Sequence, residues 1–524
     1  MLENDSGHTT SLWHQQTPSL ERPPLEGDRS ASVCVVGAGI VGLSVAYELV
    51  RAGREVVVLD DGQPGGGATL RTTAHLASGL DDRYWRLEQL HGEHGARLAA
   101  RSHAAAIDRF EQIVREEGIA CDFQRVPGYL VVGENCPDEL DREHDAAARA
   151  GLNVRIVDDF APMGVSFGRA LEFANQAQFH PGRYLAGLVD AIEKHGGRIH
   201  GGTHADSIDG TKVSTARGCV RCTGSVVATN TPVNDRLVIH TKQAPYRTYV
   251  IAGRIPSGSM RPFLLWDTED PYHYVRIQPG EGHDWLIVGG EDHKVGQDHD
   301  ASAHFDKLLQ WTRAHFPMFE SAEFQWSGQV LEPHDSLAFI GHNPMDDENV
   351  YIATGDSGNG LTHGMIAGML LRDLVTGVDN DWKSIYEPSR KSLRAAKDFL
   401  RENLNFAAQY RDLVLPGEVD NAAEIAHGEG AIVRDGLRKL AVYRDEQGAL
   451  HAHSAICPHL GCAVRWNGVE GTFDCPCHGS RFAAVDGHVI NGPANRGLAE
   501  AELHPGAPTA ADASRHEDRG GRWS

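Results

Sequence analysis

Cysteine and histidine side chains lie close together near the end of the chain, at a spacing that suits a metal site. Four of the nine cysteines fall between Cys457 and Cys477, in the segments CPHLGC and CPCHGS, and each segment also carries a histidine. Thiolate and imidazole groups bind zinc and iron. Such clustering is typical of a metal site and not of a secreted disulfide scaffold. A zinc ion is one alternative, and an iron–sulfur cluster is the other.

The two segments resemble the Rieske [2Fe–2S] motif, and the resemblance covers residues 418–504. In that motif one iron takes two cysteine thiolates and the other takes two histidines. The resemblance implies that Cys457 and Cys475 bind one iron and that His459 and His478 bind the other. Such mixed ligation gives a reduction potential of roughly −150 to +300 mV.

Further residues match positions around the cluster in cytochrome bc-type Rieske proteins. The resemblance implies a disulfide between Cys462 and Cys477, and a proline loop over the cluster at Ile490–Ala494. Ser480 keeps the family's hydroxyl donor, whereas Phe482 stands where high-potential members carry a tyrosine. Because donors to sulfur favour the reduced cluster, we predict a midpoint potential below that of the respiratory members.

A glycine-rich turn near the start of the chain has the pattern of a dinucleotide site. Gly37, Gly39 and Gly42 form G-x-G-x-x-G between the apolar run Val33–Val36 and a periodic helical segment. These glycines allow a tight turn, close approach of a pyrophosphate, and close packing of helix on strand. The pyrophosphate then lies at a helix N-terminus, where free N–H groups favour anions. Asp60 ends the next apolar run and can accept from ribose hydroxyls, which suits FAD or NAD and disfavours NADP.

Two further glycine-rich segments are candidates for contact with the same cofactor. The loop Gly62–His75 offers Thr69 and Arg71 as donors, and a flexible surface loop is the alternative. The segment Val350–Gly364 has the pattern of strand, glycine loop and helix, so its helix N-terminus can face an electron-rich part of the cofactor unless it is an ordinary turn. The predicted contacts there are Gly358, Asn359, Gly360, Leu361 and Thr362.

The glycine-rich segments and their order along the chain resemble those of FAD-dependent amine and amino-acid oxidoreductases of the D-amino-acid oxidase and glycine oxidase type. The matching segments are VVGAGIVGLSVAYEL with Asp60, GGGAT, SVVATN, WSGQ…EPHDSLAFIG and IATGDSGNGLTHG, within residues 30–375. The resemblance implies FAD, an inserted sheet over the flavin ring, and substrates that lose a hydride from a carbon next to nitrogen. It also puts Gly358–His363 near the pyrimidine edge of the flavin, where a helix N-terminus stabilises negative charge on the reduced ring.

The candidate catalytic residues are Arg276, Tyr274 and His75. The segment YHYVR puts Tyr274 and Arg276 on one face of a strand, because side chains alternate along it. Arg276 aligns with the family's strand arginine and is predicted to hold a substrate carboxylate. A surface arginine paired with a neighbouring acid is the alternative. His75 is a further candidate, of a residue type that is more often structural than catalytic.

These sites require an α/β fold. The strand–turn–helix–strand unit predicts a Rossmann-like FAD-binding domain, and the aromatic and β-branched runs after Tyr246 predict an antiparallel substrate sheet inserted into it. The length of 524 residues suits about three domains. The predicted parts are an irregular arm (1–29), the FAD domain (30–380, with the sheet at roughly 240–330), a helical linker (381–417), an all-β Rieske domain (418–504) and a disordered tail (505–524). The predicted helices are Asp82–Glu117, His180–His195, Met365–Leu374 and Ser389–Tyr410.

Composition restricts the partners. The formal net charge is −23, which disfavours nucleic acid and anionic membranes as partners. No apolar run approaches the roughly 18 residues that a membrane span needs. The polar, acidic N-terminus lacks the pattern of a signal peptide, so we expect a cytoplasmic protein.

The two redox sites together predict an oxidoreductase that acts on a C–N bond of an amino acid or N-methylated amine. Flavin accepts two electrons as a hydride, and a [2Fe–2S] cluster forwards them singly to an external acceptor, a protein or a quinone. A single dinucleotide fingerprint disfavours a nicotinamide donor. One alternative is an amine oxidase that returns electrons to O₂ as peroxide and has a structural Rieske domain. Another is an electron-transfer component of an oxygenase system.

Overall fold

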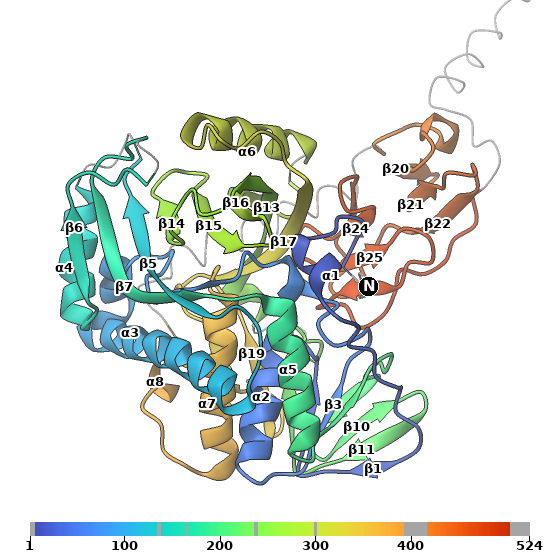
Figure 1. Cartoon of the computed structure of the whole chain (residues 1–524). Coiled ribbons are helices and arrows are strands. Elements are labelled where there is room, and N and C mark those ends of the chain that lie inside the picture. The colour runs from blue at the N-terminus through green and yellow to red at the C-terminus, as the bar shows by residue number, and fades with distance from the viewer. Residues whose placement is uncertain are drawn as a thin grey trace, which may run out of the picture.

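The computed structural model describes residues 6–133, 138–162, 165–234, 239–297, 301–391 and 417–503. They form a nucleotide domain around a mostly parallel sheet, a second domain around a larger mixed sheet, and a C-terminal all-β domain at one side (Figure 1). The predicted α/β architecture with an all-β C-terminal domain is confirmed.

The nucleotide domain is built on a sheet that is buried on both faces. Val33 and Val35 pack among helices, whereas Cys34 and Val36 pack against a small second sheet. This double burial explains the continuous apolar runs in the sequence. The main sheet has the order β18 (Phe339–His342), β19 (Val350–Thr354), β12 (Gly224–Val227), β2 (Val33–Val36), β3 (Val56–Leu59) and β8 (Arg198–His200), and only β18 runs antiparallel to its neighbour. The small sheet has the order β1 (Arg29–Ser30), β11 (Gly218–Arg221), β10 (Lys212–Thr215) and β9 (Ser207–Asp209).

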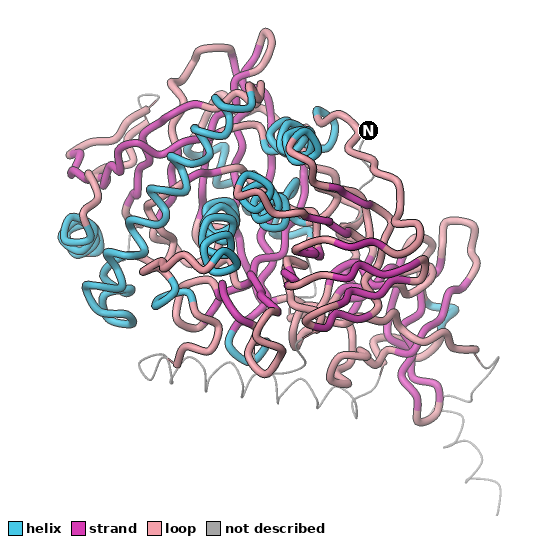
Figure 2. The backbone as a smooth tube through the Cα atoms, turned by 90° about the horizontal axis from the view of Figure 1, so that it is seen from below, coloured by secondary structure: helices cyan, strands magenta, loops and turns pink. Residues whose placement is uncertain are grey.

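Helices cover one side of this sheet. Most of them gather away from the strand-rich C-terminal domain (Figure 2). The α2 and α7 helices cross closely, because a Cβ at Gly368 would lie 3.0 Å from the Ser44 backbone. The helices on this side are α2 (Ile40–Arg51), α3 (Tyr84–Glu117), α5 (Pro181–Lys194), α7 (Gly360–Thr376) and α8 (Lys383–Tyr386), whereas α4 (Glu139–Ala150) packs on α3 and on the larger mixed sheet. The helix predicted after the glycine turn, Val41–Arg51, is confirmed as α2, and three of the other predicted helices are confirmed as α3, α5 and α7.

The predicted inserted sheet is present and is larger than the sequence indicated. Its antiparallel strands continue through the parallel pair β14–β5 into strands that precede the insertion along the chain. Helix α6 (Ser302–His315) packs on it through Phe305 and Leu308. The order is β17 (Phe324–Pro333), β13 (Gln243–Pro256), β16 (His283–Lys294), β15 (His273–Pro279), β14 (Leu264–Asp267), β5 (Gln124–Val131), β7 (Ala170–Gln178) and β4 (His75–Leu76), with β6 (Val154–Val157) beside β7.

The C-terminal domain contains two small antiparallel sheets. Its core includes Cys457, Cys462, Cys475 and Cys477. One sheet has the order β20 (Glu429–Asp435), β21 (Arg438–Arg444) and β22 (Leu450–Ser454). The other has β23 (Arg465–Asn467), β24 (Thr472–Asp474), β25 (Arg481–Ala483) and β26 (Val489–Asn491).

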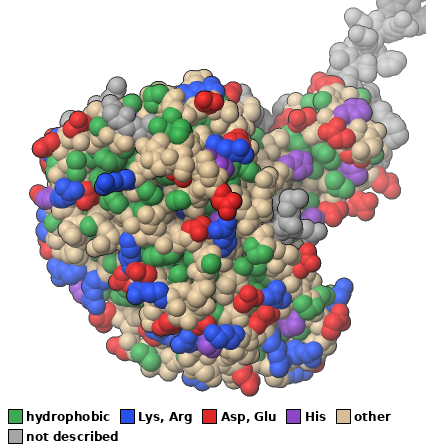
Figure 3. Space-filling model, viewed as in Figure 1, with side chains coloured by type: hydrophobic (Ala, Val, Ile, Leu, Met, Phe, Trp, Pro, Cys, Tyr) green, Lys and Arg blue, Asp and Glu red, His purple; other side chains and the backbone are tan. Residues whose placement is uncertain are grey.

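The N-terminal arm lies between the domains. It contains α1 (Leu12–Gln16), in which Leu12 and Trp13 are fully buried, and its His8 N–H donates to the Glu470 carbonyl at 2.9 Å. The arm is therefore part of the folded structure. The predicted linker helix from residue 392 onward and the tail at 505–524 lie outside the described residues. Acidic and basic side chains are interspersed on the face in Figure 3. No described helix is both long and apolar enough to cross a membrane.

Candidate functional site

Two positions at the turn between β2 and α2, Gly37 and Gly42, have room only for glycine. At Gly37, where φ is +105°, a Cβ would lie 2.4 Å from the Ala228 carbonyl oxygen. At Gly42 a Cβ would lie 1.8 Å from the carbonyl oxygen of Gly37. The side-chain-free turn leaves the α2 N-terminus open to an anionic group.

Two predicted polar residues flank this turn. Asp60 accepts hydrogen bonds from Ala38 N at 2.5 Å and Gly62 N at 3.0 Å. Thr69 Oγ1 accepts from Ile40 N at 2.9 Å, at the start of α2. Both side chains line the same cavity as the turn.

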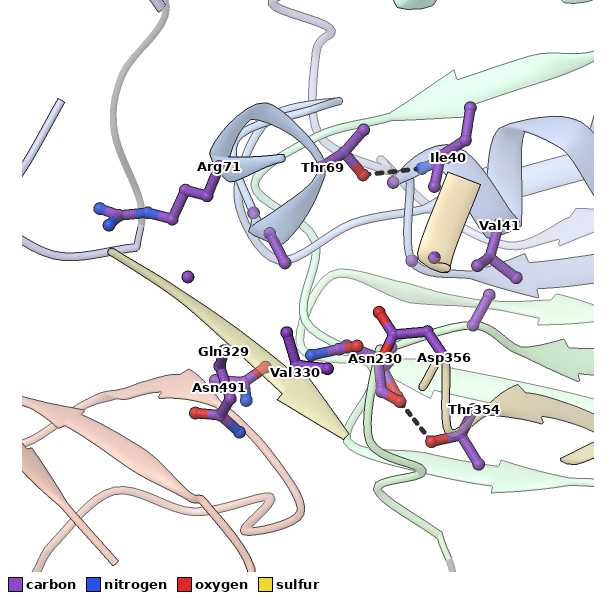
Figure 4. Close-up of a pocket in the computed structure, with 18 of the residues that line it drawn as sticks. Ile40, Val41, Thr69, Arg71, Asn230, Gln329, Val330, Thr354, Asp356 and Asn491 are labelled. Carbon is purple, nitrogen blue, oxygen red and sulfur yellow. Dashed lines mark hydrogen bonds between the residues drawn. The ribbon is translucent and has the colours of Figure 1, made fainter. Parts of the chain in front are cut away.

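The cavity extends from the turn to the mixed sheet and to the C-terminal domain (Figure 4). On its far side are β17 and the segment 489–495. The loop before α7 and the start of that helix contribute four of the predicted cofactor residues, Gly358, Asn359, Gly360 and Leu361. Thr362 faces elsewhere, because its Oγ1 lies 2.9 Å from His103 Nδ1.

One end of the cavity is lined by aromatic rings and carboxyl groups. Tyr272, Tyr274 and Trp266 lie there with Asp81 and Asp356. Burial raises the pKa of both carboxyls to about 6. Burial likewise raises the pKa of nearby Asp292 to about 7 and that of Glu332 well above its usual range. This end of the cavity favours a cation.

Arg276 lies away from the cavity, so the prediction that it holds a substrate carboxylate does not fit the structure. Its Nη1 donates to the carbonyl oxygens of Thr73, Ala74 and Phe179 at 2.9–3.2 Å, and its Nη2 donates to Gln278. Strand alternation placed Arg276 on the correct face, but the N-terminal arm covers that stretch, with the guanidinium 5.4 Å from the Trp13 ring centroid.

Tyr274 and His75 do line the cavity. The Tyr274 hydroxyl lies 2.7 Å from Thr248 Oγ1. His75 has Nδ1 3.0 Å from Thr73 Oγ1 and Nε2 3.2 Å from the Val275 carbonyl oxygen. Burial, with the Arg276 guanidinium nearby, lowers the pKa of His75 to about 3, so the ring is neutral and both nitrogens are engaged.

The two cysteine–histidine segments form matching loops. Gly461 N donates to Cys457 O at 3.0 Å, and Gly479 N donates to Cys475 O at 3.0 Å. Both glycines have positive φ, at +81° and +78°. A hydrogen bond with the Cys475 thiol, together with backbone N–H groups and the Ser480 hydroxyl, lowers the pKa of Cys457, which favours the thiolate that a metal requires.

The four predicted ligands lie at the tips of these loops. The rings of His459 and His478 meet edge to face with centroids 5.0 Å apart, and the thiols of Cys457 and Cys475 are buried and not part of a disulfide. Cys462 and Cys477 form the predicted disulfide. Their sulfur atoms lie within 4.8 Å of Cys475 Sγ, but the disulfide removes them from the set of possible ligands.

A buried ion network joins the C-terminal domain to the rest of the protein. Arg71 Nη1 lies 2.8 Å from Glu470 Oε1, and Arg247 Nη2 lies 3.1 Å from Asp474 Oδ2. All four side chains are at most 3% exposed. The Arg71 guanidinium, which the sequence predicted to contact the cofactor, therefore lies in this interface although the residue also borders the cavity.

Comparison with known proteins divides the chain into the same two parts, the FAD-binding part and the C-terminal domain. The family model described as FAD dependent oxidoreductase matches residues 32–374. The chain belongs to this family. A second model, the Rieske [2Fe-2S] domain, matches residues 416–502. The cofactors are therefore FAD and a [2Fe–2S] cluster, and the zinc alternative is set aside.

Relatives share this architecture in whole or in part. The putative Rieske 2Fe-2S iron-sulfur protein YhfW of Bacillus subtilis is 32% identical over 503 residues, 94% of this chain and 97% of that protein. Gamma-glutamylputrescine oxidoreductase of Escherichia coli is 26% identical over 66% of this chain and 84% of that protein. The crystal structure of glycine oxidase from Geobacillus kaustophilus superposes with a TM-score of 0.59 at 19% identity, covering 69% of this chain and 99% of that one, which shows a shared fold.

The structure fits both cofactors and adds residues that the sequence did not reveal. The glycine turn would admit a pyrophosphate, and two buried thiols beside two imidazoles suit a Rieske cluster. Gln329 from β17 and Asn491 from the Rieske domain also line the FAD cavity. Both lie in segments that the resemblances named, WSGQ and the proline loop Ile490–Ala494, but neither resemblance implied a contact between these side chains and the FAD cavity.

Proposed function

We propose that this protein oxidises a C–N bond of a small cationic amine, and that the electrons leave through the Rieske cluster to an external one-electron acceptor, a protein or a quinone. FAD supplies a hydride acceptor, and the cluster supplies a one-electron carrier. One observation carries the proposal. Gln329 lines the FAD cavity and donates from Nε2 to the Gly479 carbonyl at 3.1 Å, beside the proposed ligand His478.

The orientation of the Rieske domain supports transfer within one chain. His240, from the short helical turn His240–Lys242 of the FAD-domain side, has its ring centroid 4.9 Å from that of His459 and 6.0 Å from that of His478. The histidine side of the proposed cluster therefore faces the FAD domain. A Rieske domain that served only as a distant appendage would not need this orientation.

The cavity favours an amine over an amino acid. Within the described part of the chain, Arg71 is the single arginine or lysine that lines the cavity, and its guanidinium is paired with Glu470. A substrate carboxylate would instead meet Asp81 and Asp356. Like charges at close range in a buried site are unfavourable, whereas an ammonium group would be stabilised there.

In the proposed reaction, the residues around this end bind the substrate and accept its proton. Tyr272 and Tyr274 would flank the substrate carbon chain, and Asp81 would hold the ammonium group and take its proton as the neutral amine forms. Loss of a hydride from the adjacent carbon then leaves a C=N bond. The neutral, doubly engaged His75 orients neighbouring residues and is not proposed as the base.

The test is an anaerobic titration of the purified protein with a pair of compounds of similar size. N-methylethanolamine carries a hydroxymethyl group where N-methylglycine carries a carboxylate. We expect the former to bleach the flavin at lower concentration, followed by growth of the Rieske EPR signal. A cluster that stays oxidised while aerobic turnover yields stoichiometric peroxide would instead support the simple oxidase. A preference for N-methylglycine would contradict the substrate class.

A further inference from the structure

One loop of the Rieske domain closes the FAD cavity. Within Val489–Asn495, every residue except Pro493 lines the cavity. The loop lies tightly on the FAD domain, because a Cβ at Gly492 would be 3.2 Å from Val233 Cγ1 and 3.3 Å from the Thr231 carbonyl oxygen. Asn495 Nδ2 also donates to the carbonyl oxygens of Ala205 and Asp206 at 3.4 Å.

Several amide groups at this boundary have buried atoms without a hydrogen-bond partner among the residues that the structure describes. They are Nδ2 of Asn491, Oδ1 of Asn495, Oε1 of Gln329 and Nδ2 of Asn230, and all four residues line the cavity. Gln329 is only 8% exposed, and its Nε2 already donates to Gly479 O, so Oε1 is the atom left for another group. Leaving such a group unsatisfied costs about 1–3 kcal/mol.

Shielding of the cluster explains only those contacts of the loop Val489–Asn495 that face the cluster-binding segments. Ala494 N donates to Ser480 Oγ at 3.0 Å, which fixes the loop against the cluster-binding segment. That contact uses the backbone and leaves the Asn491 side chain on the cavity side, beside Gln329 and Val330 (Figure 4). A shield alone would not require a polar side chain with a buried donor there.

We propose that the Rieske loop Val489–Asn495 is part of the FAD-binding site, with the Asn491 amide donating a hydrogen bond to the bound cofactor. FAD offers phosphate, hydroxyl and carbonyl oxygens as acceptors. The cofactor then contacts both domains, and its binding is coupled to the docking of the Rieske domain. Because such coupling is reciprocal, docking strengthens FAD binding to the same extent that FAD strengthens docking.

The first experiment measures FAD affinity in the full-length, cluster-loaded protein after removal of its flavin. FAD is titrated into wild type, Asn491→Ala and the control Gln447→Ala, with quenching of flavin fluorescence as the signal. Gln447 is an exposed residue of the same domain, distant from the cavity lining. Loss of one hydrogen bond should raise the Kd for FAD by roughly 2- to 13-fold in Asn491→Ala and leave the control unchanged. The Rieske EPR signal and iron content should be unchanged in both variants.

The second experiment needs no variant and so remains decisive if Asn491→Ala loses its cluster. Hydrogen exchange is compared between FAD-loaded and FAD-depleted wild-type protein, both with the cluster present. We expect FAD to slow amide exchange within residues 489–495. Equal FAD affinity in Asn491→Ala with an intact cluster would overturn the assigned hydrogen bond. Equal exchange with and without FAD would overturn the coupling between the cofactor and the Rieske domain.

Discussion

Replacing Glu470 with glutamine tests the buried network that holds the Rieske domain against the FAD domain. Glu470 is fully buried, with Arg71 at 2.8 Å and Arg247 at 3.9 Å. Burial by itself would raise the pKa of Glu470, but the surrounding arginines outweigh it and hold the pKa at about 2, against 4.5 for a free glutamate. The carboxylate is therefore stabilised by the folded, docked structure.

The size of the effect follows from the pKa difference. A depression from 4.5 to about 2, at about 1.4 kcal/mol per pKa unit, corresponds to about 3 kcal/mol. Because the folded-state pKa is the lower one, this stabilisation is fully present above pH 4.5 and is lost as the pH falls toward 2. Glu470→Gln removes the carboxylate 2.8 Å from buried Arg71 at every pH, while Arg247 and Arg481 keep their pairing with Asp474, so we expect a loss of about 3–5 kcal/mol at pH 7.

The assay is urea unfolding of the full chain, followed by flavin fluorescence and by visible circular dichroism of the cluster, from pH 3.5 to 7. Wild type should lose stability below pH 4.5, and Glu470→Gln should show a lower midpoint at pH 7 with a weaker dependence on pH. Asp141→Asn is the control, because Asp141 pairs with Arg169 on the surface, and it should leave the midpoint unchanged. A wild-type midpoint in Glu470→Gln at pH 7 would refute the stabilising role of this network.

Three further outcomes are expected. Phe482→Tyr should raise the cluster midpoint potential by about 20–60 mV, which is the effect of one added hydrogen bond on a one-electron couple. An EPR redox titration measures this potential, and a fall would contradict the predicted role of this position. Alkylation of the denatured protein without reductant should leave Cys462 and Cys477 unlabelled by intact mass, and labelling of both would show that the disulfide does not form in solution. Asp81→Asn should raise the KM for a cationic amine more than it lowers kcat, whereas an unchanged KM would remove Asp81 from the substrate site.

The cluster segments and the dinucleotide turn were the parts that the sequence could predict. In both, the chemistry depends on residues close together in sequence, so spacing alone implies geometry. The Gly461 and Gly479 turns, with their positive φ values, place each cysteine next to its histidine without help from distant segments. The domain order was predictable because each domain contains a motif of residues that are close together in sequence.

Arg276 shows where such reasoning fails. Period-two alternation correctly placed it on the face of Tyr274, but it could not tell which part of that face lines the cavity. Trp13, from the N-terminal arm, covers the arginine instead. A covering residue more than 260 positions away leaves no trace in the local pattern.

The loop that carries Thr69 and Arg71 connects the FAD-binding turn with the Rieske domain, and the local sequence pattern does not reveal this connection. Both residues lie in one short helical turn, Ala68–Arg71, yet Thr69 contacts the start of α2 while Arg71 extends away from it to Glu470, 399 positions later in the chain (Figure 4). A shift of this turn would disturb the FAD-binding turn and the Rieske interface together. The sequence predicted contact between this loop and the cofactor, with a flexible surface loop as the alternative. The contact of Arg71 with the Rieske domain follows only from the three-dimensional structure, and this shared turn is a route by which the proposed coupling between FAD binding and Rieske docking would act.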